Sequence, residues 1–222
     1  MLQTLSNETV AESCYRRIRS DIIFDRLHPG QKLKLDSLKD AYGTSISTLR
    51  EILNRLSADG LVLAEGQRGF EVAPVSASDL QEIAALRLLL ETHALSQSMA
   101  DGDTEWEARV VSAHYKLTRM EDVMTSNDAD SAEDWKRYDR EFHQSLISAC
   151  GSNLLMETHS NVFDKYLRYQ MVTQSYRGDV ASAEHRQLLD AALARDEKTA
   201  KKVLTMHIQS GMEHALVVGK LS

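Results

Sequence analysis

Proline is confined to the first third of this 222-residue chain, at Pro29 and Pro74. Because proline removes a backbone donor and clashes with the preceding helical turn, a stretch without it is free to form long helices. Residues 75–222 contain no proline, and apolar side chains recur there at three- and four-residue steps. The sequence therefore predicts a mainly α chain whose C-terminal part is built from helices alone.

Short polar or glycine-containing breaks divide this proline-free part into six predicted helices. Ser78 is expected to cap the first helix, which ends before the break at 101–103. The other five are predicted over about 104–125, 131–150, 153–176, 180–194 and 196–218. Long helices with short connections pack as antiparallel neighbours, so we expect an antiparallel helical bundle over 76–222.

The first 75 residues show a different order of elements. Helices are predicted over about 9–27, 35–42 and 46–59, ended by Pro29-Gly30, Gly43 and Gly60 respectively. Two short β-prone runs, 61–63 and 70–72, then flank a glycine-containing turn. Three helices followed by a hairpin is the order of a winged helix-turn-helix, which we assign to residues 1–75.

The net charge of −7 is unevenly distributed. Residues 1–74 carry ten Lys/Arg and ten Asp/Glu, whereas residues 75–222 carry sixteen and twenty-three. The first part is therefore able to present a local basic face to phosphates. No apolar run is long enough to cross a bilayer and no secretion signal is evident, so we expect a cytoplasmic protein without a membrane partner.

The third predicted helix has the pattern of a DNA-recognition helix. Its apolar positions form one face, and four polar side chains remain outward near its start: Ser45, Ser47, Thr48 and Arg50. Arginine can donate two hydrogen bonds to guanine, and small hydroxyls suit phosphates or bases. Arg68, in the turn of the hairpin, is placed to reach a minor groove or a phosphate. The alternative is that these are solvated polar residues around a small domain.

Four residues of the C-terminal part have the spacing of a metal site. Asp139 and His143 are four apart and so project from one face of a helix. His185 and His207 lie on two further predicted helices that a bundle can bring together. Three imidazoles and one carboxylate favour Zn, Ni, Mn or Fe over Ca or Mg. A chance occurrence is the alternative, because the chain has eight histidines.

The N-terminal motifs resemble those of the GntR family of bacterial regulators. The runs LHPGQKL, SxSTLREILNRLxADGLV and GQRGFEVAPVS follow that family's pattern in order and spacing across about residues 9–75. The resemblance implies a winged helix-turn-helix that binds operator DNA, with Arg50 in the recognition helix and Arg68-Gly69 at the wing tip. Ile46 departs from the pattern, since many members have arginine there.

The C-terminal motifs are similar to the FadR-like branch with an FCD effector domain. They are SxxDLxEIxxLRxxLE, DxxFH, EHRQLLDAALARD and MHI. The resemblance implies that Asp139, His143, His185 and His207 hold a divalent transition metal. The segment GDTEWEARVVSAHYKL also looks like the carbon-starvation-induced regulators of this branch, which implies a dicarboxylate such as glutarate or 2-hydroxyglutarate.

An anionic effector needs a cation to orient it, and Arg87 and Arg168 are the candidates. A salt bridge or an exposed helix face is the alternative for both, and Glu91 is four residues after Arg87.

We therefore expect a homodimeric repressor that is released from operator DNA by a small organic acid bound at the metal. Two other hypotheses use the same three-histidine, one-aspartate site: a metal-dependent enzyme and a direct metal sensor. Against the enzyme, Glu141 and Glu184 are expected to point away from the motif, which leaves no general base.

Overall fold

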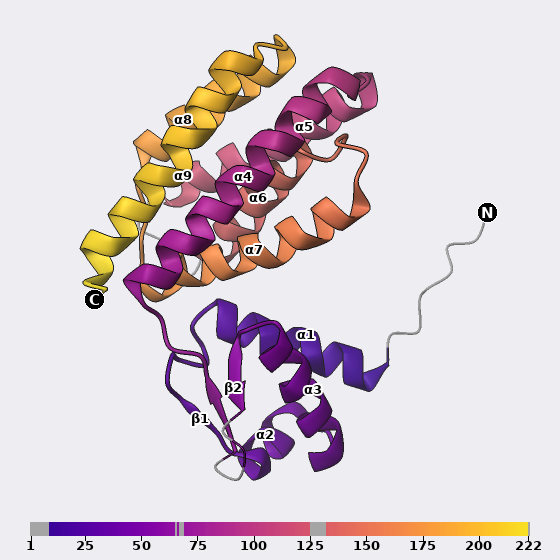
Figure 1. The fold of residues 1–222 in the computed structure, drawn as a ribbon, viewed down its shortest axis with the longest axis vertical. Helices are drawn as coiled ribbons and strands as arrows, with labels where there is room; N and C mark the ends of the chain where they lie inside the picture. Colours follow the sequence, from indigo (N-terminus) through magenta and orange to yellow (C-terminus); the bar gives the residue numbers. More distant parts are fainter. Residues whose placement is uncertain (1–8, 65, 67–68, 125–131, 222) are drawn as a thin grey trace, which may run out of the picture. The chain divides into compact units, whose positions relative to one another are not determined.

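The structure of the protein is a computed structural model that describes residues 9–64, 66, 69–124 and 132–221. The chain divides into two compact units, Met1–Val75 and Ser76–Ser222 (Figure 1). Within the described ranges, no helix has both the length and the apolar character that crossing a membrane requires.

The described residues of the first unit form three helices and a small antiparallel sheet. Its elements are α1 (Val10–Ile23), β1 (Lys32–Leu33), α2 (Leu35–Tyr42), α3 (Ile46–Ala58), β2 (Val62–Ala64) and β3 (Phe70–Val72). The strands lie in the order β1-β3-β2, so the expected hairpin has a third strand that the sequence did not reveal. Gly30 allows this strand to form, because its φ of 75° turns the chain back and its N–H donates to the carbonyl of Val72 at 3.0 Å.

The helix-turn-helix is held by capping and by one apolar face. Ser45 caps α3 and accepts a hydrogen bond from the N–H of Thr48 at 3.2 Å. Gly43 ends α2 in the left-handed conformation, as predicted. The inward face of α3 is fully buried through Leu49, Ile52, Leu53 and Leu56. The opposite face of α3 therefore takes no part in packing the core.

The first helix is shorter than predicted, ending at Ile23 rather than near residue 27. Asp25 adopts a left-handed φ of 58°, and the N–H groups of Arg26 and Leu27 both donate to the carbonyl of Asp21. This turn brings Leu27 against the core of the unit. Burial of an apolar side chain therefore ends the helix before Pro29 is reached.

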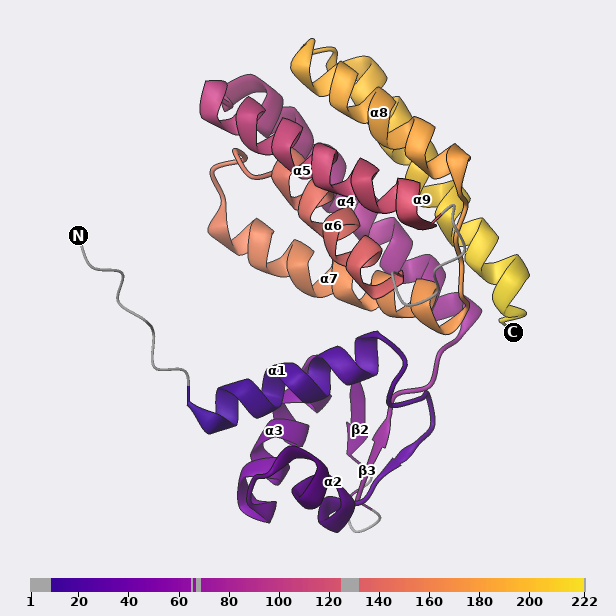
Figure 2. The same ribbon diagram turned by 180° about the vertical axis from the view of Figure 1, so that it is seen from behind.

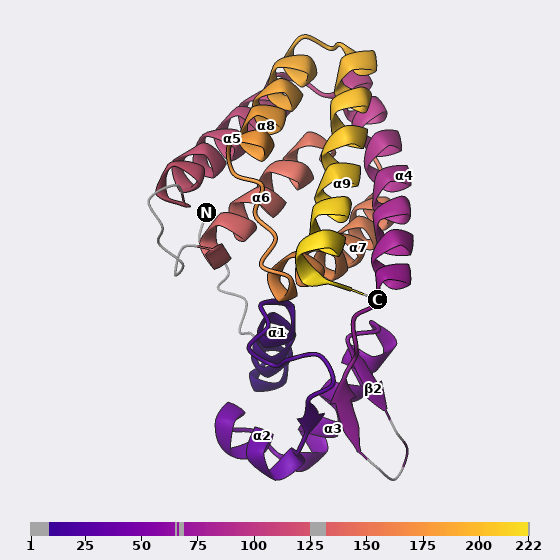
Figure 3. The ribbon, with the colours of Figure 1, turned by 90° about the vertical axis from the view of Figure 1, so that its left-hand side faces the viewer.

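The second unit is an antiparallel bundle of helices. In the described part of the chain these are α4 (Ala77–Asp101), α5 (Thr104–Met124), α6 (Ala132–Leu146), α7 (Asn153–Val172), α8 (Asp179–Leu193) and α9 (Glu197–Gly219). Helix α5 packs along α6 (Figure 2), and α9 packs along both α4 and α8 (Figure 3). The whole chain is thus mainly α, with a winged helix-turn-helix followed by a helical bundle.

Three boundaries in the bundle differ from the prediction. Ser76, not Ser78, caps α4, because its side chain accepts from the N–H of Asp79 at 3.2 Å. Helix α6 ends at Leu146 instead of 150, where the N–H of Ala149 turns to the side chain of Ser98 at 3.1 Å. Helix α7 ends at Val172 instead of 176. The predicted start of α6 at 131 and the expected break at 126–128 lie outside the described residues.

Candidate metal and effector site

Four candidate ligands converge in the middle of the bundle. Asp139 and His143 lie one turn apart on α6, while α8 supplies His185 and α9 supplies His207. One ligand atom from each lies within 4.8 Å of all the others. All four side chains are buried, between 0% and 7% exposed. The structure thus brings together every residue of the predicted metal site.

A glutamate holds the Nδ1 atom of each of these imidazoles. Glu91 on α4 lies 3.0 Å from Nδ1 of His143, and Glu121 on α5 lies 2.8 Å from Nδ1 of His185. On α8, Glu184 lies 2.7 Å from Nδ1 of His207. A carboxylate on one ring nitrogen fixes the tautomer and leaves the other nitrogen as a metal ligand. Such carboxylate–histidine pairs are typical of metal sites in proteins.

The other ring nitrogens fit a divalent transition metal. Nε2 of His143 and Nε2 of His185 are buried and have no hydrogen-bond partner among the described residues. Nε2 of His185 lies 3.2 Å from a carboxylate oxygen of Asp139, and Nε2 of His143 lies 3.9 Å from the same oxygen. Buried polar atoms without a hydrogen bond are costly, and an ion between these three groups would satisfy all of them.

The protonation states favour metal binding at two of the three imidazoles. Burial lowers the pKa of His143 and lowers the pKa of His207 further, so both rings are neutral. Burial also lowers the pKa of His185, but the carboxylates of Asp139 and Glu121 beside the ring outweigh it and the pKa is raised. For Asp139, burial raises the pKa, but Lys136 and His185 hold it well below its usual range. A neutral imidazole and an ionised carboxylate are the forms that bind a metal.

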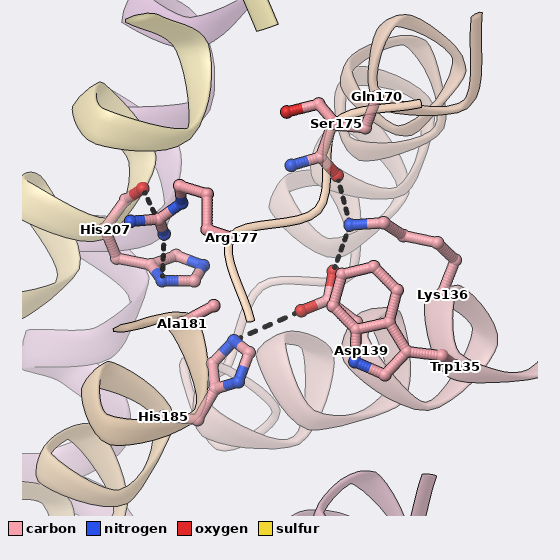
Figure 4. A pocket seen from close by; sticks show the side chains of 9 residues that line it. All are labelled: Trp135, Lys136, Asp139, Gln170, Ser175, Arg177, Ala181, His185 and His207. Atoms are coloured by element: carbon pink, nitrogen blue, oxygen red, sulfur yellow. Dashed lines mark hydrogen bonds and ion pairs between the residues drawn. The ribbon is translucent and has the colours of Figure 1, made fainter. Parts of the chain in front are cut away.

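A small cavity adjoins three of the candidate ligands (Figure 4). Its volume is about 10 Å³, which is close to the space of one water molecule. The lining comprises Trp135, Lys136, Asp139, Gln170, Ser175, Arg177, Ala181, His185 and His207. Two of these side chains, Lys136 and Arg177, are cations, and each lies beside a candidate ligand, Lys136 beside Asp139 and Arg177 beside His207 (Figure 4).

Both cations are fixed by hydrogen bonds. Lys136 donates to Gln170 at 2.7 Å and lies 3.7 Å from Asp139. Burial lowers the pKa of Lys136 to about 8, although Asp139 opposes the change. Arg177 donates to the two carboxylate oxygens of Glu184 at 3.0 and 2.6 Å. It also donates to the backbone oxygen of His207 at 3.2 Å.

The two arginines predicted to bind an effector lie elsewhere. Arg87 is buried on α4, where its Nε donates to Glu91 at 2.6 Å and its guanidinium packs over the rings of Phe163 and Tyr166. Arg168 is buried on α7. Neither belongs to the lining of the cavity, whose described cations are Lys136 and Arg177. For Arg87 the geometry matches the alternative of a salt bridge with Glu91.

One sequence interpretation of the site needs correction. Glu184 does not point away from the ligands, because α9 brings His207 directly against it. The sequence also gave no reason to include His159, whose Nε2 lies 2.8 Å from Glu91. Glu141 does face outward, where it accepts from Lys116 at 2.6 Å. The adjacency of Glu184 to His185 was the available signal, but neighbours on a helix project about 100° apart and so suggested different surroundings.

The predicted DNA-reading residues lie at the start of α3 and in the wing. Ser47 and Arg50 are exposed. Ser45 is also exposed, but its hydroxyl is engaged in the cap and lies 2.8 Å from that of Ser47 and 2.9 Å from that of Thr48. Gly69 has a φ of 95°, which suits glycine. Arg68 lies outside the described residues.

Comparison with known proteins assigns both units to families. Residues 10–72 match the model for bacterial regulatory proteins of the gntR family, and residues 82–210 match the FCD domain. Among solved structures, McbR/YncC of E. coli has a TM-score of 0.79 at 18% identity, covering 95% of this chain and 98% of that one. That likeness establishes the shared fold.

Two relatives match over most of the sequence. The uncharacterized HTH-type transcriptional regulator BphR of Paraburkholderia xenovorans is 37% identical over 92% of this chain and 84% of its own length. The HTH-type transcriptional repressor GlaR of Escherichia coli is 31% identical over 87% of this chain and 90% of its own length. Because both families and relatives are regulators, the site does not belong to an enzyme. The chain belongs to the GntR family of bacterial DNA-binding transcription regulators and carries an FCD domain after its helix-turn-helix.

Proposed function

We propose that this regulator is a dimeric repressor that leaves its operator when a small carboxylate binds beside a metal ion in the FCD domain. The observation that carries the proposal is the cluster of three imidazoles and one carboxylate, within which each imidazole is held by its own glutamate. The relative described as a transcriptional repressor supports the direction of control.

The metal would be a divalent transition ion, Zn, Ni, Mn or Fe, held by Asp139, His143, His185 and His207. When bound, it supplies a Lewis acid with coordination positions open to a carboxylate oxygen. The choice among these ions is set by availability as much as by the ligands.

The charge balance of the site favours an anionic effector. Among the described residues, the ligand aspartate and the three glutamates that hold the histidines contribute four negative charges. The cations in contact with them contribute three: Arg87, Lys136 and Arg177. A divalent ion would leave this buried centre with one net positive charge. Binding one carboxylate neutralises it, which lowers the cost of burying the charges.

Operator recognition is proposed for the outward face of α3 and for the wing. Ser47, Thr48 and Arg50 would contact bases or phosphates from the start of the helix, beside the capping Ser45. Arg68 and Gly69 would lie at the wing tip, in or near the adjacent minor groove. The buried apolar face of α3 leaves these positions available to DNA.

Dimerisation is proposed because two recognition helices must reach successive half-sites of an operator. The outer face of α4 supports it, since Leu86 is 42% and Leu89 66% exposed there. The effector would shift the equilibrium between domain arrangements. The favoured arrangement would be one in which the spacing of the two recognition helices no longer matches successive half-sites of the operator. The effector can shift this equilibrium only through its different affinity for the two arrangements.

A gel-shift with DNA from upstream of the adjacent operon tests the proposal. Wild-type protein should bind, Arg50→Ala should not, and a carboxylate at saturating metal should release the wild type. Asp139→Asn should bind DNA but resist release, whereas Asp134→Asn, which changes an exposed residue of the same helix, should behave as wild type. Release that follows metal concentration, with no effect of any acid, would make the protein a metal sensor instead.

A further inference from the structure

The segment 174–178, which connects α7 to α8, covers the cavity beside the candidate ligands and is called the strap here. Ser175 and Arg177 of the strap line the cavity (Figure 4). The strap begins in strained backbone, because Gln174 has a φ of 50°, whereas the φ of 52° at its other end falls on Gly178, which adopts it without strain. A left-handed conformation is unfavourable for a residue such as glutamine unless its surroundings enforce it.

Side chains hold the strap closed. The ring of Tyr176 packs edge-on against Trp135 of α6, with 4.7 Å between the ring centroids. Arg177 reaches inward to Glu184, forming two parallel hydrogen bonds. The hydroxyls of Ser175 and Tyr176 are buried with no hydrogen-bond partner among the described residues. The closed strap therefore leaves two buried hydroxyls without a hydrogen bond. Their cost offsets part of the stabilisation that the contacts of Tyr176 and Arg177 contribute to the closed conformation.

The closed cavity is too small for an organic acid. A volume of about 10 Å³ accommodates roughly one water, whereas a carboxylate group has three heavy atoms. The inner walls are formed by Asp139, His185 and His207, which are buried on long packed helices. The strap is the part of the wall that lies outside a helix. A ligand larger than water must therefore displace the strap to reach the candidate metal ligands.

From this geometry we infer that Arg177 is the residue that selects an anionic effector, and that the effector displaces the strap which carries it. The inference rests on the proposed function, because it names the partner of the effector's carboxylate at that site. Guanidinium has five donors in a planar fork. Two of them donate to Glu184 and one to the backbone oxygen of His207, and the same Nη2 atom lies 3.1 Å from Nδ1 of His207. The remaining donors can hold a carboxylate, while Glu184 keeps the fork oriented.

Lys136 is the second cation of the cavity but is less suited to this role. Its ammonium is buried against Trp135 at 3.8 Å from the ring centroid, and it is already shared between Gln170 and Asp139. It belongs to α6, whereas Arg177 belongs to the strap that a ligand must move. Arg177 would therefore both select the anion and move with the strap when the site opens.

Titration calorimetry on full-length protein at saturating Zn²⁺ tests the inference. The probes are acetate, lactate, succinate and glutarate, each compared with its carboxamide, after Zn²⁺ affinity has been measured separately. Arg177→Gln should weaken carboxylate binding by about tenfold or more, and Arg177→Lys should restore part of it. Arg109→Gln, at an exposed position of α5, is the matched control and should bind as wild type.

Fluorescence of Trp135 reports the strap itself. A bound carboxylate should change the emission of wild-type protein by separating Trp135 from Tyr176, and Trp135→Phe should abolish that change. Equal carboxylate affinity in wild type and Arg177→Gln would overturn the inference but leave the proposed function intact. The same holds for a change in emission on carboxylate binding that persists in Trp135→Phe. If wild-type protein binds none of the carboxylates, the proposed function fails and the inference fails with it.

Discussion

Replacing Glu91 by glutamine tests whether the buried charge network of the FCD domain is a single cooperative unit. The carboxylate of Glu91 accepts from Nε of Arg87 at 2.6 Å and lies 3.0 Å from His143 and 2.8 Å from His159. Glu91 and Arg87 are each 1% exposed. The pKa of Glu91 is well below its usual range, because Arg87 and His143 outweigh the effect of burial.

The expected loss of stability follows from the charge that remains. Glutamine keeps the shape of the side chain but removes its negative charge, so Arg87 stays buried with no opposite charge beside it. Breaking a buried ion pair in this way costs about 3–5 kcal/mol of unfolding free energy. An exposed pair loses far less, because water screens both partners.

Urea unfolding followed by tryptophan fluorescence measures this loss in the right part of the chain. Trp106 and Trp135 are the two tryptophans of the sequence, and both belong to the second unit. Glu141→Gln is the matched control, since its salt bridge with Lys116 has the same 2.6 Å length but is 41–45% exposed. Both variants are compared with wild type in chelator at one protein concentration, so that neither metal binding nor dimerisation differs between samples.

A loss below about 1 kcal/mol for Glu91→Gln would refute the reasoning, because it would mean that Arg87 does not depend on Glu91. A double variant, Arg87→Met with Glu91→Gln, separates charge from packing. If the unpaired charge causes the loss, removing Arg87 as well should recover a large part of the stability.

Three further predictions concern other parts of the molecule. Gly102→Ala should destabilise the second unit by about 1–3 kcal/mol in the same urea assay. The reason is that a β-carbon there would lie 2.5 Å from the carbonyl oxygen of Ser98 and 2.6 Å from the ring of Trp106. An unchanged midpoint of urea unfolding would contradict this. Ser45→Ala should cost the first unit about 1 kcal/mol in thermal melts by circular dichroism, and Ser45→Asp should restore that stability; if Ser45 also contacts phosphate, Ser45→Asp will not restore operator affinity. Burial and a hydrogen bond to Asp21 raise the pKa of Tyr42 above its ordinary value, so its neutral form stabilises the first unit below about pH 10 and that contribution is lost as pH rises further. Above that pH, the melting temperature of Tyr42→Phe should therefore fall less steeply with pH than that of wild type. Melting temperatures that fall in parallel would show that the tyrosine is not responsible.

Much of the fold could be predicted because its signals are local. The absence of proline after residue 74, the apolar periodicity and the capping positions Gly43 and Ser45 act within a few residues of the chain. The errors fell where a distant contact decides the local structure. Leu27 leaves the helix because the core can bury it, and β1 exists because β3 is there to pair with it. Such contacts leave no trace in a window of neighbouring residues.

The four candidate metal ligands could be selected from the sequence because two of them are four residues apart on a predicted helix and all four fit the pattern of a known family. Their environment could not be predicted in the same way. Glutamate is most often a surface residue, and nothing near Glu91 or Glu121 in sequence marks them as partners of a histidine. Glu184 is next to His185 in sequence, but its partner is His207. Nor could Arg177 be selected from the sequence, since it enters the cavity only because the chain leaves α7 at Val172.

The sequence by itself determined the class of each unit and the order of its elements, because those depend on short-range pattern, and it named the four candidate ligands that the structure brings together. Only the tertiary structure decided which carboxylates hold which imidazoles and which cations face the cavity. Each carboxylate–imidazole pair joins residues of two different helices. The paired residues are 23 positions apart in sequence for Glu184 with His207 and 64 apart for Glu121 with His185. These pairs form because burying an ionised group is favourable only when a partner of opposite charge or a hydrogen-bond donor is brought to it.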